Sequence, residues 1–241
     1  MAGQHADAFE ANSGQRPLPA FPDFAFDRHV PHHLATLLRL ADDTPVLLRP
    51  IAPGDRRRHW RFLCGLSLQT RYQRLMSPRC LLPGELRRMV EIDYRREMAL
   101  VALAPAGQGS TPPSGHDASE RTVEVAVARY VIDDDGDSAE FAMVVTDAWQ
   151  RRGLGLRLLE RLAAVAADAG VRNLGGITLA TNTPMIRLAR RLGFTISTEP
   201  GDWTVKRLTR RLDQAPAAGS ASPPADTAAI PSRAASQASR A

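Results

Sequence analysis

The chain has 241 residues, of which 44% are hydrophobic, and carries 31 lysines and arginines against 26 acidic residues, a formal net charge of +5. The basic residues are scattered among acidic ones, and all but Lys206 are arginines, so a solvated surface is indicated and no nucleic-acid partner is expected. No apolar run approaches the roughly 20 residues of a membrane span, and two cysteines make neither a disulfide framework nor a metal motif. We therefore expect one globular domain in the cytoplasm, with no membrane contact.

Three segments are poor in core-forming residues and set the expected boundaries. Residues 1–43 predict a mostly disordered N-terminal extension, in which the run 32–40 could still pack onto the domain. Residues 213–241 are rich in Ala, Ser and Pro and predict a disordered tail. A flexible loop is expected at about 105–121, inside a single domain that covers residues 44–212.

Strand and helix signals then follow one another in chain order. The first half predicts a strand at 45–51, a helix after Asp55, helices at 69–76 and from Pro83, and strands at 99–104, 123–132 and 139–146. Gly136 lies at the bend between the last two strands, which indicates an antiparallel hairpin. The second half predicts a helix at 154–167, a strand at 177–181, a helix at 184–192 and a strand at 203–208. The fold class is therefore α+β, a mostly antiparallel mixed sheet with one parallel strand–helix–strand crossover.

The strongest local signal for chemistry is the run from Gln150 to Gly155 (QRRGLG), which lies between a strand and a helix. Glycines let the backbone approach a ligand closely, and the helix start adds unpaired N–H groups and a positive dipole end, which suits a pyrophosphate. A Walker loop would need Gly-Lys-Ser/Thr, which is missing, and a dinucleotide fingerprint would need a third glycine where Leu158 stands. A glycine-rich helix start without a ligand stays open as the alternative.

Gln150, Gly153 and Gly155 match the Gln/Arg-x-x-Gly-x-Gly/Ala pattern of the GNAT (Gcn5-related N-acetyltransferase) superfamily. The run from Asn182 to Phe194 resembles the last conserved GNAT motif, and it lies on the expected second strand of the crossover and the following helix. Upstream, residues 48–51, 67–72 and 97–102 resemble the Pat-type bacterial protein lysine acetyltransferase branch. The resemblance covers about residues 45–208 and implies a GNAT-type fold with helices on both faces of the sheet.

The same resemblance implies acetyl-CoA as the co-substrate, held between two strands that splay apart. Main-chain groups of residues 143–145 would bind the pantetheine arm, and the N–H groups of residues 151–156 would bind the pyrophosphate. The residues that it assigns to cofactor binding are Met143, Val144, Val145, Gln150, Arg151, Arg152, Gly153, Leu154, Gly155, Leu156, Asn182 and Met185.

Transfer to an amine also needs a base, because a lysine ammonium with a pKa of about 10.4 must lose a proton before it attacks a thioester. The resemblance places Glu140 in this role, with apolar neighbours expected to bury it; an isolated strand glutamate would otherwise be read as an ordinary exposed carboxylate. Many GNAT enzymes use a tyrosine to protonate the leaving thiolate, and Ala189 stands at that position here. Since a thiol has a pKa near 8.5, water can serve as the proton source.

The expected activity is transfer of an acetyl group from acetyl-CoA to a primary amine. The resemblance implies a protein lysine as the acceptor, for example on an acyl-CoA synthetase. Two alternatives stay open: an acetyltransferase for a small amine or antibiotic, and a non-catalytic acyl-CoA-binding regulatory module. No metal is expected, because His29, His32 and His33 lack other ligands and the acidic run 133–137 lacks calcium-loop spacing. Trp60 and Tyr72 are interpreted as core residues.

Overall fold

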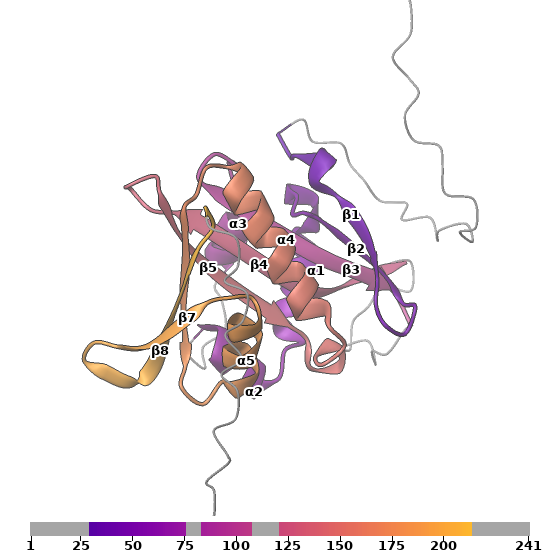
Figure 1. Ribbon diagram of the computed structural model, residues 1–241. Helices are drawn as coiled ribbons and strands as arrows, with labels where there is room; N and C mark the ends of the chain where they lie inside the picture. The colour runs from indigo at the N-terminus through magenta and orange to yellow at the C-terminus, as the bar shows by residue number, and fades with distance from the viewer. Residues whose placement is uncertain (1–28, 76–82, 108–120, 214–241) are drawn as a thin grey trace, which may run out of the picture.

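The computed structural model describes residues 29–75, 83–107 and 121–213. The described ranges do not include residues 1–28 and 214–241, for which disorder is expected. They also leave out most of the loop expected at 105–121. Within them, eight strands form one sheet in the order β1-β2-β3-β4-β5-β6-β8-β7 (Figure 1). Its strands are β1 (Thr36–Arg39), β2 (Pro45–Pro50), β3 (Glu97–Pro105), β4 (Thr122–Ile132), β5 (Ser138–Val145), β6 (Asn173–Leu179), β7 (Thr195–Glu199) and β8 (Asp202–Arg211).

The sheet pairs its neighbours antiparallel except at β5 and β6, which run parallel and are joined through a helix. The α-helices are α1 (Arg56–Cys64), α2 (Leu68–Leu75), α3 (Pro83–Val90), α4 (Leu154–Asp168) and α5 (Thr183–Arg191). Short 3-10 turns lie at η1 (His32–Leu34), η2 (Pro53–Asp55) and η3 (Asp147–Trp149). The predicted α+β fold, mostly antiparallel with one parallel crossover, is confirmed.

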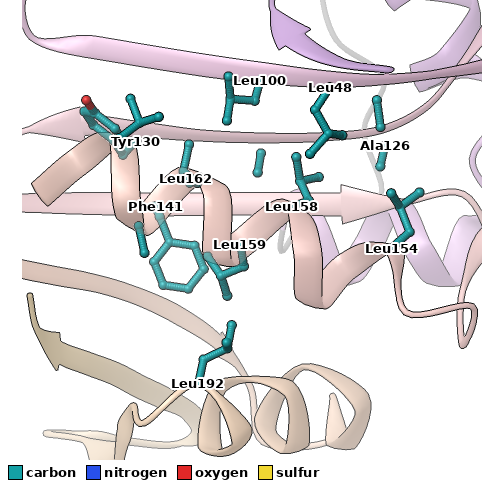
Figure 2. Close-up of a cluster of buried hydrophobic side chains, with 14 of the residues drawn as sticks. Leu48, Leu100, Ala126, Tyr130, Phe141, Leu154, Leu158, Leu159, Leu162 and Leu192 are labelled. Atoms are coloured by element: carbon teal, nitrogen blue, oxygen red, sulfur yellow. The ribbon is translucent and has the colours of Figure 1, made fainter. Parts of the chain in front are cut away.

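Helix α4 crosses one face of the sheet and carries the main core (Figures 1 and 2). Its leucines 154, 158, 159 and 162 are fully buried and face Leu48 and Leu100 from the sheet. Burying each such side chain contributes about 1.5–3 kcal/mol, so the helix is fixed firmly on the strands. The opposite face holds a second cluster, in which Phe62 of α1 and Val90 of α3 pack against β3, β4 and β5. Helices thus lie on both faces, as predicted.

Strands β5 and β6 pair over a short stretch and then separate. Their register runs Ser138 to Asn173, Ala139 to Leu174 and Glu140 to Gly175, where the pairing ends. Residues 141–145 continue in β5 beside β4, whereas β6 continues beside β8. A gap therefore opens along β5 directly after Glu140.

The structure contains two strands that the sequence did not predict, and it exposes two aromatic residues that were expected in the core. Strands β1 and β7 were not predicted, and the sheet begins at Thr36, before the boundary near residue 43. Both are short edge strands with little buried surface, so they carry no clear apolar alternation. The prediction that Trp60 and Tyr72 belong to the core is wrong: they are 36% and 43% exposed.

Strand β6 starts at Asn173, four residues before the predicted start at 177, because the pair Gly175-Gly176 reads as a turn in the sequence. In the fold, Gly176 is needed for a close approach between strands. A Cβ atom on Gly176 would lie 2.9 Å from the carbonyl oxygen of Phe141 and 3.0 Å from its ring. The glycine lets β6 lie close to the place where the strands part.

Substitution of Gly176 by alanine is expected to lower the free energy of unfolding by about 1–3 kcal/mol, because the added methyl group overlaps backbone and ring atoms. Urea denaturation of the full chain measures the change. Gly54→Ala serves as the control, since no atom lies within 4 Å of a Cβ atom there. Equal stability of the two variants would contradict the close packing of Gly176.

Candidate active site

A groove of about 780 Å³ lies where β5 and β6 have separated. Its walls come from β5, the loop before α4, the first turns of α4 and α5, and helix α2. It brings together most residues predicted from the sequence to hold a cofactor: Met143, Val144, Val145, Gln150, Arg151, Gly153, Gly155, Leu156, Asn182 and Met185. These residues share one surface although they come from separate elements. That they bind a cofactor stays a prediction.

The loop before α4 turns sharply and exposes the start of the helix. Arg151 and Gly153 both have a positive φ, 61° and 83°, and Gly153 caps α4 without a side-chain hydrogen bond. The first four N–H groups of a helix have no partner within it, and they lie at the positive end of its dipole. Gly153, Gly155 and Leu156 line the groove, so this helix start faces it. The arrangement suits an anionic group such as a pyrophosphate.

Two residues of the predicted set have side chains directed elsewhere. Leu154 is fully buried in the core beneath α4. The Arg152 guanidinium pairs with Asp42, donates to Thr44 Oγ1 at 3.0 Å and lies 4.2 Å above the centre of the Trp149 ring. The hydrogen bond from Arg152 lowers the pKa of Asp42 from the ordinary 3.8 to about 2. Only the main chain of these two residues is therefore left for a ligand, and the Arg152 side chain ties the loop to the β1–β2 turn.

A polar network that the sequence did not predict joins α2 to the same loop. Asp147 accepts hydrogen bonds from Ser67 Oγ at 2.9 Å and Thr70 Oγ1 at 2.8 Å. Gln150 Nε2 donates to the carbonyl oxygen of Val145 at 3.1 Å and to Thr70 Oγ1 at 3.3 Å. The Gln150 side chain thus supports the loop, and the network fixes α2 as one wall of the groove.

Replacing Asp147 with asparagine is expected to cost on the order of 1 kcal/mol of unfolding free energy at neutral pH, because charged hydrogen bonds are lost. Burial opposes ionisation of Asp147, but the hydrogen bonds from Thr70 and Ser67 hold its pKa below the ordinary 3.8. A lowered carboxyl pKa gives stability that is present above 3.8 and is lost as the pH falls through the lowered value.

The difference in unfolding free energy between the wild type and Asp147→Asn should therefore shrink as the pH falls below about 4. Urea denaturation at several pH values measures it. Asp168→Asn is the control, since that exposed carboxylate makes no hydrogen bond with any residue in the described ranges. A constant difference across the pH series would argue against an ionised Asp147 in this network.

The other wall begins at Asn182, which caps α5. Its Oδ1 accepts a hydrogen bond from the Met185 N–H at 3.3 Å, and its Nδ2 donates to Thr178 Oγ1 at 3.1 Å. This capping fixes how α5 follows β6 beside the groove. Farther along α5, the exposed Arg187 and Arg191 also line the groove and add positive charge.

Glu140, the predicted base, lies at the last paired position before the strands part. Side chains alternate along a strand, so Glu140 points to the same face as Val144, which packs in the α1–α3 cluster. It lines a second hollow of about 880 Å³, with residues of β6, β7 and β8 such as Gly175, Ile177 and Arg207. The expectation that apolar neighbours bury Glu140 is wrong: its side chain is exposed, and it is not part of the apolar cluster that α1 and α3 form with the sheet.

Several residues of the groove had no assigned role in the sequence: Thr70, Gln73, Arg74, Asp147, Pro184, Arg187, Leu188 and Arg191. The helical spacing of Arg187 and Arg191 could have shown that they share a face with the start of α5. No local signal marks Thr70 or Arg74, which reach the groove from a helix about 70 residues earlier in the chain.

Ala189, at the position of the tyrosine that many GNAT enzymes use, is fully buried in the core under α4. It offers no proton donor to the groove. Among the described residues, no group of three or more His, Cys, Asp or Glu side chains is placed to hold a metal ion. In the same ranges no helix is long and apolar enough to cross a membrane.

Comparisons with known proteins agree with this geometry. Residues 95–194 match the model of the acetyltransferase (GNAT) family. The chain is 32% identical over 166 residues to acetyltransferase PA5475 of Pseudomonas aeruginosa, covering 68% of this chain and 83% of that protein. It is 30% identical over 147 residues to acetyltransferase Pat of Mycolicibacterium smegmatis, covering 61% of this chain but 40% of that longer protein. The solved GNAT domain of PAT from S. lividans superposes with a TM-score of 0.62 at 28% identity, over 75% of this chain and 98% of that one.

Proposed function

Because the chain belongs to the GNAT acetyltransferase family, in its Pat-like branch, and is an acyl-CoA-dependent N-acyltransferase, we propose that it transfers an acetyl group from acetyl-CoA to a protein lysine. One observation carries the proposal: two hollows are lined by neighbouring stretches of strand β5. Met143 lines the groove at the helix start, and Glu140, three residues before it, lines the hollow over β6 and β8. Donor and acceptor would reach the same short stretch of one strand from two sides.

The groove has the features that CoA needs. Its volume of about 780 Å³ is in the range of small-molecule sites. The start of α4 provides N–H groups for the pyrophosphate, and the cations of Arg151, Arg187 and Arg191 add favourable charge. Residues 141–145 of β5 have no pairing in β6, so main-chain groups on that edge can bond the pantetheine arm. One N–H of that edge would also stabilise the oxyanion that develops at the thioester carbonyl.

Glu140 is the group that can accept the acceptor's proton. The neutral amine attacks the thioester carbonyl carbon, its proton passes to the Glu140 carboxylate, and the carbon–sulfur bond breaks to release CoA. Glu140 is an exposed carboxylate at the end of the paired stretch, it lines the hollow, and its charge acts on Arg74, which lines the groove. This position, rather than burial, supports its role as base.

The acceptor class is supported by the form of the second hollow. It is open, extends over β6, β7 and β8, and includes the half-exposed Ile177 beside acidic Glu140 and Glu199. An open surface of this kind can receive a lysine side chain that projects from a folded protein. The Pat-type relatives support the same acceptor.

A thiol-release assay with acetyl-CoA tests the proposal. The acceptor panel contains acyl-CoA synthetases, free lysine, simple alkylamines and an aminoglycoside, and the Glu140→Gln variant runs beside the wild type. Glu140-dependent thiol release with a protein acceptor, and acetylated lysine in its peptides, is the expected result. Release only with small amines would replace the protein acceptor, whereas CoA binding without turnover on any acceptor would indicate a regulatory module.

A further inference from the structure

Arg74 lies where the cofactor groove meets a small second cavity. It comes from the last turn of α2 and lines the groove together with Met143 and Leu188. Behind it, a hollow of about 20 Å³ is lined by Arg74, Arg129 and His59 among apolar side chains. Because Met143 follows Glu140 by three residues on β5, this is the end of the groove nearest the base.

In the part of the chain that the structure describes, the Arg74 guanidinium has no direct counter-ion. Among the described residues it makes no hydrogen bond or ion pair, although its neighbour Arg129 bonds Glu97 Oε2 at 2.8 Å. Burial and the charge of Arg129 lower the pKa of Arg74 to about 10, and the Glu140 charge opposes that effect. Arg74 is therefore a cation at neutral pH. A partly desolvated cation without a partner is unfavourable in the ligand-free fold. Such a cation is typical of a site where a ligand or a reaction step supplies negative charge.

Acyl transfer produces such a charge at this end of the groove. When the carbon–sulfur bond breaks, its electron pair goes to sulfur, and the leaving group is a thiolate until it is protonated. Helix α5 offers no acid at the usual place, since Ala189 is fully buried and carries no hydroxyl. On the facing helix α2, the cation that lines the groove is Arg74, and it does so together with Met143, three residues from Glu140.

We propose that Arg74 stabilises the departing CoA thiolate by charge and by a guanidinium hydrogen bond, in place of a proton donor on α5. The inference rests on the proposed function. The balance of the step is complete: the amine proton passes to Glu140, the bond electrons pass to sulfur, and the thiolate later takes a proton from water. Protonation neutralises Glu140 as the thiolate forms, so the charge that Arg74 faces moves from the carboxylate to the sulfur.

A thiol titration of bound CoA tests this without any acceptor. The ultraviolet absorbance of the thiolate is followed against pH in complexes of CoA with the full-length wild type, Arg74→Gln, Arg74→Lys and Arg187→Gln. In the wild-type complex we expect the thiol pKa to fall by about one unit below that of free CoA. Arg74→Gln should abolish the shift, and Arg74→Lys should keep most of it because the charge remains. Arg187→Gln, a cation on the other wall, should weaken CoA affinity and leave the thiol pKa shifted.

Turnover gives a second readout. With acetyl-CoA, Arg74→Gln should lower kcat about ten- to a hundredfold with little change in KM, the pattern of an interaction made mainly in the transition state. An equal thiol pKa in the wild-type and Arg74→Gln complexes would overturn the inference while leaving the transferase activity intact. Failure of the wild type to bind CoA would overturn the proposed function as well. Arg74→Lys guards against a folding defect, since it keeps the charge and a long aliphatic stem.

Discussion

Glu140→Gln is expected to lower kcat by a factor of about 10²–10⁴, with the Kd for acetyl-CoA changed by less than about threefold. The amide cannot take the proton of the attacking amine, yet it keeps the shape of the side chain. Glu140 lies outside the residues that line the cofactor groove, so acetyl-CoA affinity should not depend on it. Steady-state thiol release gives kcat, and titration calorimetry gives Kd.

The matched control is Glu199→Gln, which removes a carboxylate from the same hollow. Glu199 pairs with Arg207 and lies on β7, away from the point where β5 and β6 separate. Loss of the Glu199 carboxylate should change the KM for the acceptor and leave kcat within about threefold of the wild-type value. Because Glu140 is exposed, Glu140→Gln should also unfold within about 0.5 kcal/mol of the wild type. Full activity of Glu140→Gln would show that another group accepts the proton.

Gly155→Glu is expected to weaken acetyl-CoA binding by at least about a hundredfold, roughly 2.7 kcal/mol. Gly155 lies in the first turn of α4, where an added Cβ atom would face Met143 Cε at 3.5 Å and Leu188 Cδ1 at 3.7 Å across the groove. A glutamate side chain would extend into this space and place a negative charge at the helix start where the pyrophosphate is proposed to bind. Titration calorimetry with acetyl-CoA measures the loss.

Stability separates this effect from misfolding. A glutamate in the first turn is a better helix former than glycine and interacts favourably with the helix dipole, so thermal unfolding should not occur at a lower temperature. Gly155→Ala is the matched control, because its methyl group would make ordinary van der Waals contacts and should leave Kd within about threefold. If Gly155→Glu binds acetyl-CoA as the wild type does, the helix start is not the phosphate site.

Strand β5 shows which features of the candidate site local sequence patterns can predict. The hairpin of β4 and β5 could be predicted because apolar residues alternate on either side of a turn at Gly136. The residue at which β5 leaves β6 was not predicted from local patterns, because the pairing that ends at Glu140 and Gly175 joins segments about 35 residues apart. The exposure of Glu140 also depends on distant segments, since the α1–α3 cluster reaches β5 at Val144 and does not include Glu140.

By itself, the sequence determined the order of most elements, the crossover, and the glycine loop at the start of α4. These features are local: leucines four residues apart define a helical face, and glycine permits the positive φ at position 153. Only the tertiary structure decided where side chains of that loop point, with Arg152 turned to Asp42 and Gln150 bonded to Val145. It also brought Arg74 and Asp147 to the groove walls. The physical reason is that backbone conformation is governed by neighbours in sequence, whereas side-chain partners are set by packing between distant segments.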